Sequence, residues 1–455
     1  MIEKNIHCII EITAVSSDGN GIGKIDGFTV FVPMTVTGDV LEIVIVKVLS
    51  NYAIGRMLNI ITPSPIRQDP KCPVYKRCGG CHFQHIKYKN QLEIKRGFIE
   101  DAMQRIGGFS DLKCDEVIGM DVPYRYRNKC IFPIGTDKNG ETICGFYARR
   151  SHDIIPVNDC MAGITENEKI TNAVKIYMSE VGALPYSEET HSGLIRRVFI
   201  RDGRNSGEIM VVVSVNGKDI PQKDRLVSRL LDVSDKIVSI YININETRTN
   251  NVLGEKNKLV FGKAEITDTL LGIEFKISPH SFYQINPYMT EKLYGKALEY
   301  ADIKNTDNVL DVYCGIGTIS LAAAKSAKQV TGIEIVQQAV ADAKSNAENN
   351  NIANAQFFAD SAENAVPKLI NDGARPDIVI LDPPRKGSDT STLGAISKAN
   401  PKRIIYVSCN ASTLARDAKF LNSLGYRPTV VTGVDMFPNT NHIEVVARFD
   451  KIIAK

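Results

Sequence analysis

The segment that decides the fold of this chain is residues 311–318, which read DVYCGIGT. An apolar stretch, 308–312, runs into it, and residues 319–328 after it have the composition of a helix. A strand that turns through two closely spaced glycines into a helix is typical of the first unit of a βαβ fold. Glycines at such a turn let the backbone approach a ligand at the carboxyl edge of the sheet. The pattern is only G-x-G, so a dinucleotide-binding fingerprint is incomplete, and a tight turn without a ligand is the alternative.

The rest of the C-terminal region repeats this alternation of strand and helix. The sequence predicts strands at 308–312, 329–334, 356–360, 377–381 and 403–408, and helices at 319–328, 337–350 and 412–424. This alternation indicates a mainly parallel sheet and an α/β fold. Glu334 ends the strand that follows the glycine turn, where a carboxylate can accept hydrogen bonds from both ribose hydroxyls of a nucleoside.

A second acidic residue follows the fourth predicted strand, in the segment VILDPPRKG at 379–387. Asp382 is expected at the same edge as Glu334, and the two prolines after it fix a rigid loop without amide donors. A proline-rich strand exit without a function is the alternative. Enzymes of this architecture that methylate amino groups usually carry Asn-Pro-Pro-aromatic here, so Asp382 and Arg385 argue against an exocyclic amine as the target.

The last predicted strand stops at a candidate nucleophile, Cys409, in the segment IIYVSCN at 404–410. A lone cysteine is usually a small buried apolar residue, but this one should point into the crevice at the sheet edge. Glu444 precedes the final strand and can return a carboxylate to the same crevice. A thiolate that adds to C6 of a pyrimidine makes C5 nucleophilic, and a carboxylate can later remove the C5 proton.

Three closely spaced cysteines form a second motif, with spacing C-x5-C-x2-C at Cys72, Cys78 and Cys81. A closed metal site needs a fourth ligand, for which Cys160 is the best candidate. Four thiolates suit a [4Fe–4S] cluster or a structural zinc ion. His82 and His85 keep a Cys₃His zinc site open. The remaining five cysteines are isolated in the sequence and are expected to be buried or inert: Cys8, Cys114, Cys130, Cys144 and Cys314.

The overall composition is that of a globular protein with several domains. Of the 455 residues 43% are hydrophobic and 24% are charged, and the net charge is only +3, so net charge does not indicate a nucleic-acid partner. Residues 5–60 alternate short strands with glycine turns, which favours a small β-barrel, and the TPSP segment at 62–65 is a stiff linker. We find no stretch long enough to span a membrane and no signal peptide, which predicts a cytoplasmic location.

Local basic runs offset this flat net charge. One surrounds the cysteine motif, a second mixes cations with tyrosines at 124–129, and a third comprises Arg196, Arg197, Arg201 and Arg204. Cations contact phosphates and aromatic rings stack on unpaired bases. A solvated charged surface would explain any single run, but three runs within one 140-residue stretch favour RNA binding.

On these residues the whole chain resembles the RNA (uracil-C5)-methyltransferases, and most closely the branch that acts on 23S ribosomal RNA. The resemblance implies an N-terminal OB-like TRAM β-barrel at 1–62, a central α+β domain with an iron–sulfur cluster at 66–270, and a Rossmann-like class I methyltransferase domain at 271–455. It also implies that residues 88–112 pack onto the methyltransferase domain.

The resemblance assigns roles to individual residues. It implies that Cys409 is the nucleophile and Glu444 the general base, and that Cys72, Cys78, Cys81 and Cys160 hold a [4Fe–4S] cluster. S-adenosylmethionine is expected to contact Gln284, Tyr313, Thr318, Glu334, Ser361 and Asp382. Two residues depart from the family pattern, because Tyr313 stands where Phe is common and Asn439 where His is common.

The expected partner is 23S ribosomal RNA, with no membrane and no protein partner. The same reaction on the T-loop uridine of transfer RNA is an alternative, which the TRAM barrel and the cysteine motif disfavour. A noncatalytic RNA-binding protein is a further alternative, which the presence of both Cys409 and Glu444 disfavours. Which uridine is modified, how many are modified and the oligomeric state do not follow from the sequence.

Overall fold

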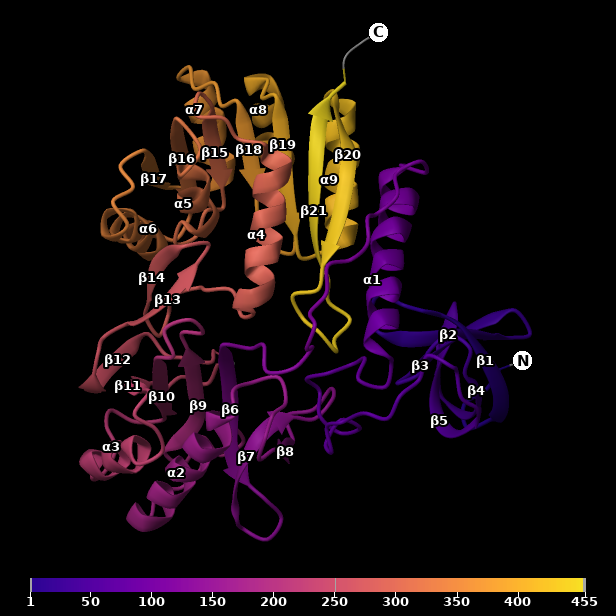
Figure 1. Ribbon diagram of the computed structural model, residues 1–455. Helices are drawn as coiled ribbons and strands as arrows, with labels where there is room; N and C mark the ends of the chain where they lie inside the picture. Colours follow the sequence, from indigo (N-terminus) through magenta and orange to yellow (C-terminus); the bar gives the residue numbers. More distant parts are fainter. Residues whose placement is uncertain (1, 250, 453–455) are drawn as a thin grey trace.

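The computed structural model describes residues 2–249 and 251–452, in three regions that follow one another along the chain (Figure 1). The first is a closed barrel with the strand order β1-β2-β3-β5-β4. Its strands are β1 (His7–Val15), β2 (Asn20–Ile25), β3 (Phe28–Pro33), β4 (Val40–Val48) and β5 (Tyr52–Thr62). Ile12, Val30, Leu41 and Ile43 fill the interior without exposure, as alternation of side chains along half-buried strands requires. The predicted small barrel is confirmed.

The central region is built on a seven-stranded sheet in the order β12-β11-β10-β9-β6-β7-β8. Its strands are β6 (Lys129–Thr136), β7 (Thr142–Tyr147), β8 (Ile154–Pro156), β9 (Ile195–Asp202), β10 (Ile209–Val215), β11 (Ile237–Ile244) and β12 (Lys256–Gly262). Two helices that the sequence analysis did not expect, α2 (Glu166–Val181) and α3 (Lys223–Leu231), pack on this sheet. The apolar run of β10 is buried on both faces, which explains its lack of polar alternation.

The third region has the predicted α/β fold. Its sheet has the order β17-β16-β15-β18-β19-β21-β20, parallel from β17 to β19, with β21 antiparallel between β19 and β20. The strands are β15 (Asn308–Val312), β16 (Gln329–Glu334), β17 (Ala355–Ala359), β18 (Ile378–Leu381), β19 (Arg403–Ser408), β20 (Tyr426–Val434) and β21 (Glu444–Lys451). All five predicted strands are present within one residue at either end.

Helices cover both faces of this sheet. They are α4 (Pro287–Ala301), α5 (Thr318–Ala324), α6 (Gln337–Asn349), α7 (Ala362–Asn371), α8 (Thr390–Ala399) and α9 (Ala411–Ser423). One apolar core joins α4, α5 and α6 to the sheet, and a second joins α7, α8 and α9 to its opposite side. The sequence analysis missed α7 and α8, because α7 contains Pro367 and α8 is short and rich in small polar residues.

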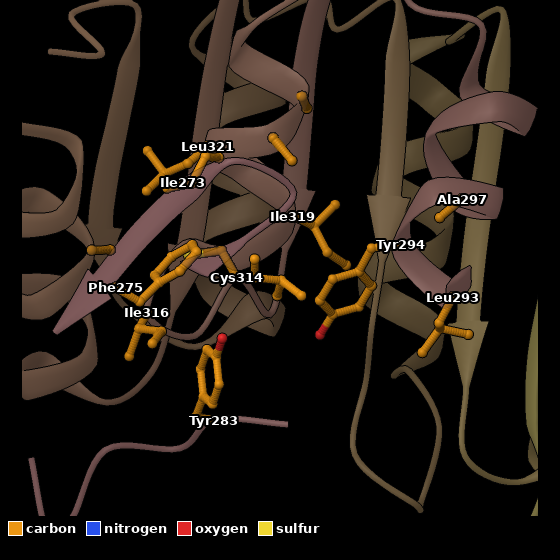
Figure 2. Packing of buried hydrophobic residues seen from close by; sticks show 14 of the residues in the cluster. Ile273, Phe275, Tyr283, Leu293, Tyr294, Ala297, Cys314, Ile316, Ile319 and Leu321 are labelled. Carbon is orange, nitrogen blue, oxygen red and sulfur yellow. The ribbon is translucent and has the colours of Figure 1, made fainter. Parts of the chain in front are cut away.

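The glycine turn of the α/β region is anchored by the first of these cores. A hairpin of β13 (Ile266–Leu270) and β14 (Ile273–Ile277) precedes α4. Figure 2 shows Ile273 and Phe275 of the hairpin near Ile316 of the turn, with Leu293 and Tyr294 of α4 on the other side. Because these side chains are buried together, the turn at the end of β15 has little freedom to move.

Helix α1 (Tyr88–Ala102) continues as a short π-helix, η1 (Met103–Gly107), and stands between the barrel and the α/β region (Figure 1). The two pack against α9, and α1 also contacts β20. Gly433 of β20 permits this approach, because a Cβ there would lie 2.8 Å from Ile99 Cδ1 and 2.9 Å from Val117 Cγ2. In the described ranges no helix is both long enough and apolar enough to cross a membrane.

Candidate active site

The turn after β15 is held close to the neighbouring strand. The amides of Tyr313 and Cys314 both donate to the Ile333 carbonyl, each at 2.9 Å. Gly317 has φ +86°, and a Cβ on it would lie 3.2 Å from the ring of Phe357, so the site requires glycine. The backbone of the turn therefore remains open toward the carboxyl edge of the sheet, where a ligand can approach it.

Glu334 lies beside this turn, as the sequence predicts. Its two carboxylate oxygens accept hydrogen bonds from the Gly315 amide at 3.1 Å and the Val336 amide at 2.9 Å, and the side chain remains partly exposed. The Asp360 amide donates to the Glu334 carbonyl at 3.0 Å, which places Ser361, the first residue before α7, next to this acid. Glu334 and Ser361 thus share one edge with the glycine turn.

A buried tyrosine connects two further predicted ligand residues. Gln284 Nε2 lies 3.2 Å from the Tyr294 hydroxyl, which Thr318 also faces. Burial, with the nearby Asp382 carboxyl, raises the pKa of Tyr294, so this hydroxyl is neutral. In Figure 2 the Tyr294 ring lies beside Ile319, and its hydroxyl points away from α4. The sequence analysis did not single out Tyr294, since an aromatic residue on an amphipathic helix is indistinguishable from ordinary core.

Tyr313 and Asp382 stand at the ends of adjacent strands. The Tyr313 hydroxyl lies 3.1 Å from Ser388 Oγ, and its backbone has φ +74°, which is uncommon for a tyrosine. Asp382 follows β18 directly, and its amide donates to the Val312 carbonyl at 3.3 Å. The six predicted cofactor-contacting residues therefore all lie along the carboxyl edge of β15, β16, β17 and β18, or beside it on the segment before α4.

Strand register brings the predicted nucleophile and base together. Ser408 of β19 pairs with Val445 of antiparallel β21, so the next residues in each direction, Cys409 and Glu444, stand opposite each other. Parallel pairing of β18 with β19 places Asp382 at the same edge. Asn410 then caps α9 by accepting from the Ser412 amide at 3.0 Å, which fixes Cys409 between a strand end and a helix start.

These acidic groups influence one another through their charges. Burial raises the pKa of Cys409 to about 11, and the Glu444 and Asp382 carboxylates add to the rise while the Arg385 guanidinium opposes it. Burial, and next the Asp382 charge, raise the pKa of Glu444 well above its ordinary value. Burial and the Asp311 charge raise the pKa of Asp382 to about 7. Burial and mutual repulsion therefore disfavour the charged form of each of these three groups.

The cysteine motif lies in the central region, around a separate cavity of about 270 Å³. Cys72, Cys78, Cys81 and Cys160 all line this cavity. Within the residues that the structure describes, no three side chains of His, Cys, Asp or Glu gather closely enough to hold a metal ion. Burial raises the pKa of Cys81 to about 11, with further contributions from the neighbouring thiols.

Cys130 is buried, as expected, and it lines the same cavity. Burial, followed by the charge of Cys160, raises its pKa to about 12. No local signal in the sequence placed it there, because Cys130 is the second residue of β6 and is far in sequence from the C-x5-C-x2-C motif.

The third basic run does not form an exposed surface, contrary to the sequence interpretation. Arg196, Arg197 and Arg201 are between 3% and 7% exposed. Their guanidinium groups donate to backbone carbonyls, among them Asn251 and Ser278, each at 2.8 Å. These arginines close loops around the central sheet and are not available to contact phosphates.

Comparisons with known proteins agree with this geometry. A family model described as tRNA (uracil-5-)-methyltransferase matches residues 223–451, and a TRAM domain model matches residues 9–58. An uncharacterized RNA methyltransferase of Clostridium tetani is 44% identical over 445 residues, which is 98% of this chain and 96% of that protein. One of Halalkalibacterium halodurans is also 44% identical, over 98% of this chain and 97% of its own length.

A solved structure extends the likeness to the whole chain. The Pyrococcus abyssi tRNA (uracil-54, C5)-methyltransferase, in complex with S-adenosyl-L-homocysteine, is 26% identical with a TM-score of 0.78. The match covers 98% of this chain and 100% of that one. A barrel that matches the TRAM model, an α/β region that matches the methyltransferase model and full-length relatives named as RNA methyltransferases show that this chain belongs to the RNA uracil-5 methyltransferase family.

Proposed function

We propose that this protein transfers a methyl group from S-adenosylmethionine to C5 of uridine in 23S ribosomal RNA through a covalent adduct with Cys409. The observation that carries the proposal is the strand register. It sets Cys409 opposite Glu444, at the point where β19 ends and β21 begins. A nucleophile and a carboxylate on the same edge are what a C5 methylation requires.

The chain's own residues account for each proton and bond in this reaction. The Cys409 thiolate adds to C6 of uracil, which breaks the C5–C6 double bond and makes C5 nucleophilic. C5 then attacks the methyl carbon of S-adenosylmethionine, the S–CH3 bond breaks, and S-adenosylhomocysteine leaves as a neutral thioether. Glu444 removes the C5 proton, the electron pair reforms the C5–C6 double bond, and the thiolate leaves. The products are 5-methyluridine, S-adenosylhomocysteine and one proton.

The residues proposed to bind S-adenosylmethionine are those at the sheet edge. Glu334 is suited to the ribose hydroxyls because its carboxylate is fixed by two amides and partly exposed. The glycine turn allows close approach of the ligand, and Ser361 and Asp382 lie on either side of it. Gln284 and Thr318 are joined through Tyr294 beside the turn.

Four thiols line one cavity of about 270 Å³, and thiolates are the ligands of iron–sulfur clusters. We propose that Cys72, Cys78, Cys81 and Cys160 hold a [4Fe–4S] cluster, whose chemistry here would be structural. Anaerobically purified protein should contain iron, and stoichiometric zinc without iron would refute this assignment.

The proposed substrate rests on the TRAM barrel and on the cysteine motif, which distinguish the ribosomal branch in the resemblance described above. Transfer RNA is the second candidate, and one observation favours it, because the Pyrococcus abyssi relative is named for uridine 54 of tRNA. An RNA substrate also agrees with the expected cytoplasmic location. The proposed domain limits remain 1–62, 66–270 and 271–455, with residues 88–112 attached to the last.

Two experiments test this function. Mapping 5-methyluridine across ribosomal and transfer RNA of a deletion strain should show a loss in 23S RNA, and a loss confined to tRNA would move the assignment to the second candidate. In vitro, Cys409→Ala should abolish methyl transfer while S-adenosylhomocysteine still binds. Near-normal turnover by this variant would exclude covalent catalysis through Cys409.

A further inference from the structure

The segment that carries Glu444 into the site is a nine-residue loop, 435–443, between β20 and β21. We call it the base loop. In Figure 1 it extends from the ends of these strands toward the N-terminal half of the chain. Glu444 is buried, and within residues 2–249 and 251–452 its carboxylate receives no hydrogen bond from the protein. The position of this carboxylate therefore depends on the backbone that leads to it.

An ion pair without solvent exposure holds the beginning of the base loop. Lys95 Nζ lies 2.6 Å from Asp435 Oδ1, and both side chains are 0% exposed. Lys95 also donates to the Phe437 carbonyl at 3.2 Å, and the Tyr88 hydroxyl donates to the second Asp435 oxygen at 2.8 Å. Lys95 and Tyr88 both belong to α1, more than 300 residues away in sequence.

A second set of contacts from the same helix holds the middle of the base loop. Gln91 makes a reciprocal pair with Asn439, accepting from its amide at 3.1 Å and donating to its side-chain oxygen at 3.2 Å. The Asn439 carbonyl also accepts from the His82 and Phe83 amides, each at 2.9 Å. Asn439 adopts φ +64°, so its backbone is in a conformation that needs these surrounding contacts.

Most of the base loop is buried, so these contacts lie in the interior. A fully desolvated ion pair is costly to break, because loss of one partner leaves an uncompensated buried charge. Gln91 is fully buried and saturates its amide, since Nε2 also donates to the Phe83 and Ile86 carbonyls at 3.0 and 2.9 Å. Lys95 and Gln91 therefore hold α1 against the base loop, which leads into Glu444.

We propose that Lys95 and Gln91 are positioning residues for the Glu444 carboxylate, which they fix through the base loop. The inference rests on the proposed role of Glu444 as the base that resolves the covalent adduct. Loosening the loop should then impair proton removal from C5 more than methyl transfer, because Cys409 and the cofactor edge belong to other elements. The expected signature is a covalent protein–RNA complex that accumulates during turnover.

The test compares Gln91→Leu and Lys95→Met with Glu444→Gln as the reference and Glu93→Gln as the control. Glu93 is an exposed carboxylate on the same helix and does not contact the base loop, so this change should leave turnover unaltered. Lys95→Met leaves Asp435 buried without its cation and can unfold the protein, so the charge-neutral double variant Lys95→Met/Asp435→Asn is measured with it. Folding is checked by circular dichroism and by S-adenosylhomocysteine binding.

With a methylatable RNA and labelled S-adenosylmethionine, single-turnover methyl transfer by Gln91→Leu should stay within about threefold of wild type. Steady-state turnover should fall at least about tenfold. This is less than the roughly 10²–10⁴-fold that a general base contributes, because the carboxylate itself remains. A denaturation-resistant complex carrying the label should appear on gels. If Glu444→Gln traps this complex while folded Gln91→Leu and the double variant turn over without trapping it, the positioning inference is wrong and the proposed function stands. If Glu444→Gln traps none, both fail. Equal slowing of both half-reactions would also overturn the inference.

Discussion

The Cys409 thiol should be a poor nucleophile in the free enzyme, and removing the Glu444 charge should improve it. Burial raises the pKa of Cys409 from 9.0 to about 11, and Glu444 is the next cause. A negative carboxylate disfavours the charged thiolate, so neutralising it must lower the thiol pKa. The perturbation is Glu444→Gln, which keeps the shape of the side chain and removes its charge.

The size of the effect follows from the pKa values. At pH 8 a thiol of pKa 9.0 is about one-tenth ionised, whereas a thiol of pKa about 11 is about one-thousandth ionised. Alkylation of Cys409 should therefore be about 100-fold slower than for an ordinary cysteine, because only the thiolate reacts. Burial of Cys409 is unchanged in Glu444→Gln. We therefore expect the Cys409 pKa to fall by about one unit and to stay above that of an ordinary cysteine.

The assay is alkylation by iodoacetamide between pH 7.5 and 10.5, with Cys409 followed by mass spectrometry of its peptide. This readout needs neither RNA nor turnover, so it is independent of the proposed reaction. Cys144 is an internal control, because burial raises its pKa to about 12 and Glu444 is not among the causes. A Cys409 alkylation rate at pH 8 that is no faster in Glu444→Gln than in wild type would refute the electrostatic reasoning.

Three further predictions concern the cofactor edge. Burial raises the pKa of Asp311 to about 7, so the folded state holds this proton more tightly than the unfolded state, and stability is lost as pH rises from about 4 to 7. Urea unfolding at pH 5 and pH 8 should show wild type losing up to about 3 kcal/mol that Asp311→Asn does not lose; equal losses would contradict this. Tyr294→Phe removes the hydroxyl beside Gln284 and should weaken S-adenosylhomocysteine binding about fivefold in calorimetry, with unchanged folding; unchanged affinity would exclude this role. Gly317→Ala forces a Cβ into a left-handed turn 3.2 Å from Phe357 and should cost at least about 1–2 kcal/mol in chemical denaturation; a neutral result would mean that the turn relaxes freely.

The sequence alone was enough to place the residues of the proposed cofactor edge together, because their positions follow from local strand and helix patterns. Parallel strands present their carboxyl ends at one side of the sheet, so Glu334 and Asp382 could be placed together from the strand ends alone. The pairing of Cys409 with Glu444 depends instead on β21 inserting antiparallel between β19 and β20. That is a long-range pairing, and no local periodicity encodes it.

Charged residues were the main source of wrong predictions from the sequence. Arg196, Arg197 and Arg201 resemble a basic patch in sequence, yet each has a place in the interior where backbone carbonyls accept from it. Lys95 carried a usable signal, because it lies on the apolar face of helix α1 between Leu92 and Ile99 and so requires a buried partner. Its partner, Asp435, could not be identified without the fold.

The proposed base, Glu444, is positioned by residues from both halves of the chain. The methyltransferase family model begins at residue 223, but the base loop is held by Lys95, Gln91 and the amides of the cysteine motif. A fragment limited to residues 271–455 would keep the glycine turn and Cys409. It would leave Asp435 without the cation that compensates its burial, and the loop that ends at Glu444 would lose its contacts with α1. The N-terminal half is therefore proposed to position the base as well as to bind RNA, through helix α1, which packs against α9 and β20.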